Sequence, residues 1–282
     1  MERSVVRRIE SRFEGARGLS LFRRAWLPPQ PAGVLVLSHG YAEHSGRYDG
    51  LGAWFAARGF AVHALDHQGH GRSAGPRGHV AAFDHFVDDL EAFLGVVRQQ
   101  HPEHPLVLIG HSMGGLIVAS YVSERTPAVA AAVTSGALLA LPDGLSRARI
   151  VMARLLRRVA PRATLRSGLD VNGLSRDPEV VRRYVEDPLV FRRMTTSLAS
   201  ELLAAVRRVG SARSPVALPM LMLHGGDDPL SPPEGTRVLF QRVRGPGSLL
   251  HIYPKLRHEI FNEPEQEDVF QDVLEWLRTR EK

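Results

Sequence analysis

The stretch LVLIGHSMGGLIVASYV, residues 106–122, places one short polar turn between two apolar runs. Residues 106–109 have the length and composition of a buried strand, and residues 116–122 are compatible with a helix. Gly110 and Gly114 allow a sharp turn on either side of Ser112. Such a turn displays the serine hydroxyl at the carboxyl edge of a sheet, beside the first N–H groups of a helix. The pattern therefore predicts a nucleophilic Ser112, and its flanking strand and helix disfavour a chance G-x-S-x-G.

Composition narrows the classes of protein that the chain can form. Its 282 residues are 44% apolar, as in ordinary globular proteins, and include no cysteine. Disulfides, thiol nucleophiles and cysteine-bound metals are therefore excluded. The charged N-terminus lacks the apolar segment of a signal peptide, and no run of 18 apolar residues occurs, so we expect a soluble, cytoplasmic protein.

Strand and helix patterns alternate along most of the chain. Strands are expected at residues 6–14, 19–26, 33–40, 60–66, 105–110, 128–136, 218–225 and 248–254. Helices are expected after Ser112 and near residues 46–58, 83–100, 233–243 and 266–280. This alternation predicts an α/β fold with a mainly parallel central sheet and helices on both faces. The chain is expected to begin with a hairpin formed by the first two strands.

Residues 141–214 interrupt the alternation with amphipathic helix patterns, including one over residues 146–160. We expect a helical cap at residues 141–214, inserted into a core formed by residues 1–140 and 215–282. The segment contains 15 arginines and 7 acidic residues, which accounts for the whole net charge of +6. No basic recognition helix or aromatic-interleaved basic strand occurs, so nucleic-acid binding is not expected.

A serine nucleophile needs a base, and the base needs a carboxylate that orients it, in the chain order Ser, Asp/Glu, His. Asp227 and Asp228 both follow the strand at 218–225, and the Gly-x-x-Asp spacing from Gly225 favours Asp228. Among the histidines, only His251 and His258 follow that aspartate. His251 lies within a strand pattern, whereas His258 lies in a loop at the required edge, and we predict His258 as the base.

An oxyanion hole needs two backbone N–H groups. Met113, directly after the nucleophile, supplies one candidate, and Tyr41, in the loop after the strand at 33–40, supplies the other. His67 and His70 could be taken for metal ligands, but no third ligand has a suitable spacing, so a structural loop is favoured and no metal is proposed. Asp66 precedes Ser112 in the chain, and we interpret it as bracing its own loop.

The sequence resembles the monoacylglycerol lipases, a branch of the serine α/β-hydrolases. The resemblance rests on SHGYAEHSGRY (38–48), DHQGHGRSAGPRGHV (66–80), GHSMGG (110–115), LSRDPEVVRRYVEDPLV (174–190), HGGDDPLSPP (224–233) and RHEIFNEP (257–264). It implies an α/β-hydrolase fold with a mobile helical cap, and hydrolysis of monoacylglycerol to glycerol and fatty acid without a cofactor.

The resemblance also implies roles for single residues. Ser112, Asp228 and His258 match the catalytic triad, and Tyr41 and Met113 match the oxyanion pair, although the family commonly has a smaller residue at the position of Tyr41. Four further residues match positions that line the glycerol end of the pocket, with hydrogen bonds that brace loops as the alternative: Glu43, Arg47, His111 and Tyr184.

Other reactions remain open on the same scaffold, namely those of a carboxylesterase, a lysophospholipase or an aryl or phthalate ester hydrolase. Dehalogenases and epoxide hydrolases are disfavoured because they use an aspartate where Ser112 stands, and the loop at 39–48 does not resemble that of proline iminopeptidases. A non-catalytic binding protein on a hydrolase fold is the alternative from a different class. A lipid ester lies in membranes or micelles, so we expect the cap to touch such a surface. The residues that would make this contact are four arginines that lie mostly on one face of the pattern at 146–160: Arg147, Arg154, Arg157 and Arg158. The alternative is a basic face that is only solvated.

Overall fold

An eight-stranded sheet forms the centre of the molecule in a computed structural model, which describes residues 6–125, 127–141 and 155–280. The strand order is β1-β2-β4-β3-β5-β6-β9-β10. β1 and β2 pair in antiparallel fashion, β2 joins β4 likewise, and all pairs from β4 to β10 are parallel. The strands are β1 (Arg7–Glu14), β2 (Ser20–Leu27), β3 (Gly33–Ser38), β4 (Phe60–Leu65), β5 (Leu106–His111), β6 (Ala131–Ser135), β9 (Met220–Gly225) and β10 (Leu249–Tyr253).

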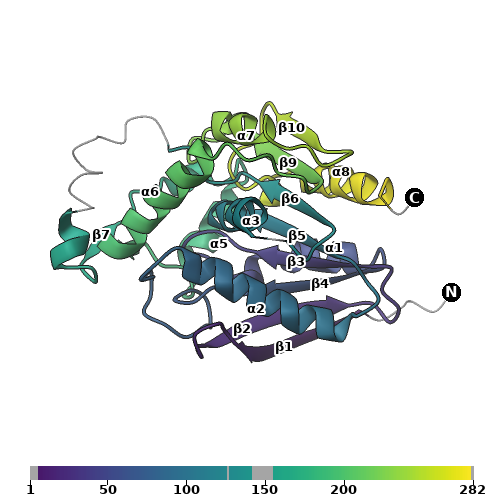
Figure 1. The fold of residues 1–282 in the computed structure, drawn as a ribbon, viewed down its shortest axis with the longest axis horizontal. Helices are drawn as coiled ribbons and strands as arrows, with labels where there is room; N and C mark the ends of the chain where they lie inside the picture. Colours follow the sequence, from purple (N-terminus) through teal and green to yellow (C-terminus); the bar gives the residue numbers. More distant parts are fainter. Residues whose placement is uncertain (1–5, 126, 142–154, 281–282) are drawn as a thin grey trace.

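Helices cover both faces of this sheet because successive strand residues point to opposite sides. Val34 and Val36 of β3 belong to one hydrophobic core, and Leu35 and Leu37 belong to the other. α2 (Asp84–Gln100), which crosses in front of the strands in Figure 1, and α3 (Met113–Glu124) pack into the first core. α1 (Asp49–Ala56) and α8 (Gln266–Arg278) pack into the second. The expected α/β fold, with its parallel sheet and N-terminal hairpin, is confirmed.

The described part of the segment between β6 and β9 adds no strand to the central sheet, and it is not purely helical. Its described elements are β7 (Thr164–Arg166), the 3-10 helix η2 (Val171–Gly173), α5 (Pro178–Glu186), β8 (Arg193–Thr195) and α6 (Thr196–Ser211). β7 and β8 form an antiparallel pair that the sequence analysis did not anticipate. Of the helix predicted over residues 146–160, residues 146–154 lie outside the described part, and residues 155–159 are helical.

This insertion lies over the loops that follow the parallel strands. Thr195 N–H donates to the Gly78 carbonyl, in the loop after β4, at 2.9 Å. Glu259 N–H, in the loop after β10, donates to the Leu174 carbonyl at 2.8 Å. Figure 1 shows β7 and the beginning of α6 beyond one end of the sheet. The insertion therefore covers the edge of the sheet formed by the carboxyl ends of the parallel strands, where Ser112, Asp228 and His258 lie.

α7 (Pro233–Phe240) completes the core over β9, and short 3-10 turns occupy Ser45–Tyr48 (η1) and Ile260–Asn262 (η3). In the part of the chain that the structure describes, no helix combines the length and apolar character needed to cross a bilayer.

Candidate active site

Ser112 occupies a strained turn between β5 and α3. Its backbone has φ 53° and ψ −117°, and among the described residues only Ala42 shares a positive φ without being glycine. Such a conformation costs about 1–3 kcal/mol and persists only where surrounding structure enforces it. A Cβ on Gly114 would lie 2.0 Å from the Ser38 carbonyl oxygen, and one on Gly110 would lie 2.5 Å from the Gly114 oxygen. Glycines are therefore required for the close approach that holds Ser112 at the edge of the sheet.

Asp228 and His258 meet beside this turn. Asp228 follows β9 and His258 follows β10, and His258 Nδ1 lies 2.7 Å from Asp228 Oδ2. The other carboxylate oxygen, Oδ1, accepts the N–H groups of Leu230 and Ser231 at 2.8 and 2.9 Å. Asp228 is thus buried and fixed from both sides, whereas Asp227 is exposed.

Ser112 is brought close to this pair by the register of β5, β6 and β9. Ser112 N–H donates to the Ser135 carbonyl, and the next residue, Gly136, donates to Leu223 of β9, each at 3.0 Å. A Cβ on Gly136 would lie 3.4 Å from His258 Nδ1. The Ser112 hydroxyl makes no hydrogen bond within the described residues, and His258 Nε2 stays available because Nδ1 faces Asp228. Ser112 and His258 therefore lie at the same edge of the sheet, and the structure describes no competing hydrogen bond for the serine hydroxyl.

The electrostatics of the pair favour an ionised aspartate and a basic histidine. Burial alone would raise the pKa of Asp228, but the neighbouring His258 and the hydrogen bond from His224 hold that pKa well below its usual range. Burial alone would lower the pKa of His258. The Asp228 carboxylate and the charges of Glu259 and Glu43 outweigh this effect, and the pKa of His258 is raised above its usual value. A carboxylate that supports a neighbouring imidazole in this way makes it a better proton acceptor.

His224 is a contact of Asp228 that the sequence analysis missed. It is fully buried at the end of β9, with Nε2 3.1 Å from Asp228 Oδ2 and 2.7 Å from the Ser231 carbonyl oxygen. Both of these groups accept hydrogen bonds, so Nε2 carries the proton and Nδ1 accepts from the Thr236 hydroxyl at 2.7 Å. A polar residue ending the apolar run at 218–223 was the available signal in the sequence.

Two backbone N–H groups near Ser112, those of Met113 and Tyr41, are without an acceptor in the described part of the chain. Met113 is the first residue of α3, where N–H groups have no intrahelical acceptor. Gly40, directly before Tyr41, lies so near that a Cβ on it would be 3.2 Å from Ser112 Cβ. Tyr41 therefore directly follows a residue that packs against the serine.

The peptide unit that carries the Tyr41 N–H is held by His39. The Gly40 carbonyl oxygen lies 2.7 Å from His39 Nδ1, and His39 Nε2 accepts the N–H of His67 at 3.0 Å. Because Nε2 faces a donor, the proton lies on Nδ1, and burial keeps the ring neutral by lowering the pKa of His39. The C=O and N–H of a trans peptide point in opposite directions. The bond from His39 to Gly40 therefore sets the direction of the Tyr41 N–H.

Glu43 braces the same loop from within. Its Oε1 accepts the Gly40 N–H at 2.5 Å and the Tyr48 hydroxyl at 2.7 Å, and its Oε2 accepts from Arg47 at 3.0 Å. Burial would raise the pKa of Glu43, but Arg47 and the neighbouring histidines lower it to about 2. Both oxygens of this carboxylate are therefore engaged by the protein itself.

Arg47 links this loop to the residue after His258 and to the insertion. Its guanidinium makes two bonds to Glu259, at 2.5 and 2.8 Å, and stands 4.7 Å from the centroid of the Tyr184 ring on α5. His111 packs its ring 4.8 Å from that of His258 and contacts Ser135 through Nδ1. Of the four residues predicted to line the glycerol pocket, His111 packs against His258, Glu43 and Arg47 brace the loop, and Tyr184 joins them through Arg47.

The remaining histidines and Asp66 near this edge organise loops. Asp66 accepts the N–H groups of Ser45 and Arg72 at 2.8 and 2.7 Å. His67 and His70 are buried, and burial lowers the pKa of each. Over the described ranges, no three histidine, aspartate or glutamate side chains are grouped so as to hold a metal ion.

Comparisons with known proteins place this geometry in a family. A family model described as serine aminopeptidase, S33, matches residues 29–265. The chain is 39% identical over 272 residues to a monoacylglycerol lipase of Mycolicibacterium smegmatis, covering 96% of this chain and 97% of that protein. It is 31% identical to the phospholipase YtpA of Bacillus subtilis, covering 87% and 95%. The crystal structure of a monoacylglycerol lipase of Paleococcus ferrophilus superposes with a TM-score of 0.82 at 34% identity, over 91% of this chain and 98% of that one.

The fold and these matches define a serine hydrolase of the α/β type that acts on carboxylic esters. Within that class, the chain belongs to the monoacylglycerol lipase family.

Proposed function

We propose that this protein hydrolyses monoacylglycerols to glycerol and free fatty acid through an acyl-enzyme formed on Ser112. The observation that carries the proposal is the buried His258–Asp228 pair, joined at 2.7 Å beside a serine held at positive φ. A serine hydroxyl becomes nucleophilic when an oriented imidazole accepts its proton. The names of relatives at 39% and 34% identity support the choice of monoacylglycerol.

In the proposed acylation, Ser112 Oγ attacks the ester carbonyl carbon while His258 Nε2 takes its proton. Asp228 keeps the proton of the neutral imidazole on Nδ1 and stabilises the imidazolium that forms. Negative charge on the carbonyl oxygen is met by the Tyr41 and Met113 N–H groups, and each such donor contributes about 3 kcal/mol in comparable sites. His258 then protonates the leaving glycerol oxygen. In deacylation, the same imidazole activates a water molecule, which releases the fatty acid.

The proposed glycerol pocket is formed by the residues that meet next to His258. Tyr184 and His111 present polar groups there, and Arg47, although braced by Glu43 and Glu259, lies against the Tyr184 ring. Polar groups beside the aromatic ring of Tyr184 are suited to an alcohol that carries one acyl chain.

The experiment that tests the proposal compares monooleoylglycerol with a chain-length series of nitrophenyl esters, after active-site labelling with a fluorophosphonate. Labelling with efficient cleavage of monooleoylglycerol is the expected result. A preference confined to short, soluble esters would favour the carboxylesterase alternative. Absence of labelling in folded protein would instead indicate the non-catalytic binding protein.

Activity is expected to fall on acidification, because His258 accepts a proton only when it is neutral. Its pKa is raised above the ordinary 6.5 by Asp228, so the protonated, inactive form persists to a higher pH than for a free histidine. The kcat/KM profile for a soluble ester is therefore expected to lose activity through an apparent pKa above 6.5. A profile that stays flat down to pH values below 6.5 would contradict this assignment of the base.

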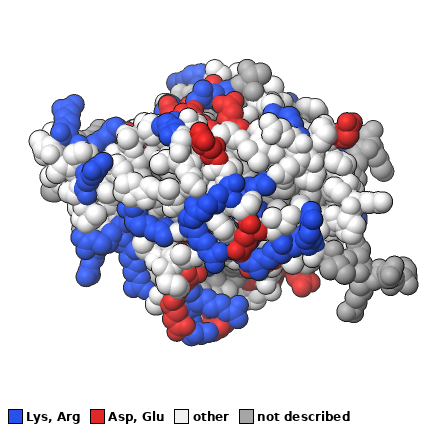
Figure 2. Space-filling model, turned by 90° about the horizontal axis from the view of Figure 1, so that it is seen from below, with Lys and Arg blue, Asp and Glu red and all other residues white. Residues whose placement is uncertain are grey.

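We also propose that the insertion touches membranes or micelles. Leu155 and Val159, one turn apart in the helix at 155–159, are 57% and 81% exposed, and Arg158 between them is exposed as well. Arg157 is less available because it pairs with Glu201, and Arg147 and Arg154 lie outside the described residues. Figure 2 shows Lys and Arg side chains at the left end, where the insertion lies, as well as on the face of the β1–β2 edge. Exposed apolar and cationic groups together are typical of interfacial helices.

Replacement of Arg147, Arg154, Arg157 and Arg158 by glutamine is expected to weaken binding to anionic vesicles, since each arginine contributes about 1 kcal/mol at such a surface. Hydrolysis of monooleoylglycerol in those vesicles should slow, and hydrolysis of a soluble ester should not change. Vesicle co-sedimentation at increasing salt provides the measurement. The matched control is Arg182→Gln with Arg183→Gln on α5. Unchanged binding and salt dependence in the fourfold variant would contradict the contact.

A further inference from the structure

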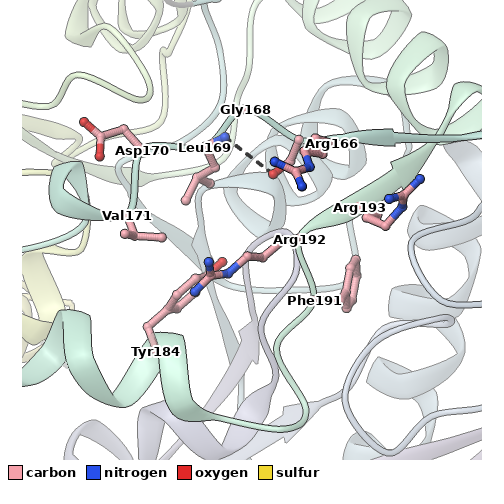
Figure 3. A pocket seen from close by; sticks show the side chains of 10 residues that line it. Arg166, Gly168, Leu169, Asp170, Val171, Tyr184, Phe191, Arg192 and Arg193 are labelled. Atoms are coloured by element: carbon pink, nitrogen blue, oxygen red, sulfur yellow. Dashed lines mark hydrogen bonds between the residues drawn. The ribbon is translucent and has the colours of Figure 1, made fainter.

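The insertion contains a cavity of about 530 Å³ between the β7–β8 pair, the loop at 168–171 and α5 (Figure 3). Its apolar wall consists of Leu169, Val171, Tyr184 and Phe191. Its charged wall consists of Arg166, Arg192 and Arg193, with Asp170 as the one acidic residue among those lining it. A cavity with such walls is suited to an anionic group attached to a larger organic molecule.

None of the three arginines has an ion-pair partner among the described residues, and two of them also make no side-chain hydrogen bond there. Arg193 donates to the Thr164 hydroxyl at 2.8 Å. Within the described part of the chain, the guanidinium groups of Arg166 and Arg192 make no hydrogen bond or ion pair. The Asp170 carboxylate accepts the Asn172 N–H at 3.0 Å, and Figure 3 shows it at the far end of the cavity from the arginines. The Arg166 and Arg192 guanidinium groups are therefore available to an anion.

Other arginines of the insertion behave differently. Three of them pair with glutamates of the insertion or of the segment before α8: Arg176, Arg182 and Arg183. Paired guanidinium groups bind an added anion less well, because a carboxylate already occupies their donors. The contrast identifies Arg166 and Arg192 as the cationic pair to test.

The cavity adjoins the proposed active site through two aromatic residues. Tyr184 contacts Arg47 of the proposed glycerol pocket, and Tyr184 and Arg192 both line the cavity (Figure 3). Phe191 lies edge-on to Tyr41, with ring centroids 5.5 Å apart, and its N–H donates to the Ala42 carbonyl of the same loop. We therefore expect a substituent on the far hydroxyl of a bound glycerol to extend past Tyr184 into this cavity.

We propose that this cavity receives the phosphate of acylglycerol phosphates, so that the enzyme also cleaves the acyl ester of phosphorylated monoacylglycerols. The inference rests on the proposed function, because the ester must lie at Ser112 for the phosphate to reach the cavity. Arginine suits this role, since its planar fork of donors matches phosphate oxygens. The reaction is unchanged: water adds across the acyl C–O bond, the fatty acid is released, and glycerol phosphate leaves with the proton from His258.

The test measures kcat and KM for monooleoylglycerol and for monooleoylglycerol phosphate, both as monomers in solution. The proteins are the wild type, Arg166→Gln, Arg192→Gln and the double variant. Loss of a hydrogen bond to a charged group is expected to raise KM for the phosphate ester by roughly 10- to 100-fold per arginine. KM for monooleoylglycerol should stay unchanged in all variants. Arg182→Gln, which removes an exposed and paired arginine of the same insertion, is the matched control.

Added glycerol phosphate and inorganic phosphate separate the possible sources of the anion. Glycerol phosphate is expected to compete with the phosphate ester in the wild type, and competition should be lost in the double variant. If inorganic phosphate inhibits hydrolysis of monooleoylglycerol as strongly as glycerol phosphate does, the site binds free phosphate and the inference is overturned. It is also overturned if the variants lose activity only in anionic vesicles, since the arginines would then serve the membrane surface.

Different results would refute the cavity assignment and the proposed function. Cleavage of monooleoylglycerol without cleavage of its phosphate, or an unchanged KM for the phosphate ester in the double variant, refutes the cavity assignment alone. Failure to cleave either ester refutes the proposed function itself.

Discussion

Ser112→Ala is expected to lower kcat for monooleoylglycerol by about a millionfold, the loss that follows removal of a serine nucleophile in comparable hydrolases. The hydroxyl makes no hydrogen bond within the described residues, so its removal leaves the packing of β5 and α3 intact. The turn itself depends on the glycines on both sides, which the substitution retains. The variant should therefore fold like the wild type and fail only in the chemistry.

Kinetics on monooleoylglycerol and a soluble nitrophenyl ester measure the loss, with thermal unfolding as the check on the fold. Ser120→Ala is the matched control, because Ser120 lies buried in the same helix and its hydroxyl has no partner among the described residues. The control should retain both activity and fluorophosphonate labelling. Residual activity of Ser112→Ala above about a hundredth of the wild type would refute the nucleophile, because triad removal costs far more.

Asp228→Asn is expected to lower kcat by roughly four orders of magnitude through the wrong imidazole tautomer. The structure explains why the amide would take the damaging orientation. Oδ1 accepts two backbone N–H groups, from Leu230 and Ser231, so an asparagine places its oxygen there. Its NH₂ group then faces His258 Nδ1, which must accept and leave the proton on Nε2. An imidazole protonated on Nε2 cannot take the proton of Ser112.

Asp227→Asn is the matched control, since it makes the same change one residue earlier at an exposed position. We expect it to lower kcat by less than about tenfold, because its carboxylate does not orient the imidazole. Steady-state kinetics of both variants at a pH above the apparent pKa of His258 provide the comparison. A larger loss for Asp227→Asn than for Asp228→Asn would show that the wrong aspartate has been assigned.

Much of the fold follows from local patterns in the sequence. Short apolar runs such as residues 33–38 and 106–109 are continuous because both faces of their strands are covered, and this predicted a parallel sheet. The elbow at Ser112 could also be predicted, because glycines flank the serine between a strand pattern and a helix pattern. The structure adds that Gly114 approaches Ser38 too closely for a side chain. Chain order and the spacing from Gly225 separated Asp228 and His258 from their neighbours, and the structure joins these two residues by a hydrogen bond.

Several contacts between segments far apart in the chain could not be predicted from the sequence. The β7–β8 pair was not anticipated, because its three-residue strands are too short to show a period. The apolar run before His224 marks it as a polar residue at a strand end, but its contact with Asp228 depends on how the loop after β9 folds back.

The sequence by itself determined the order of the strands and helices along the chain and the glycine-flanked turn at Ser112, because both depend on residues close together in the chain. Only the tertiary structure decided which charged side chains are paired within the protein and which remain able to bind a ligand. Glu43 and Arg47 are engaged with each other, with Gly40 and with Glu259, while Arg166 and Arg192 face a cavity without a partner. A charged side chain has the same identity in the sequence whether or not it is paired, and pairing depends on which segments the fold brings together.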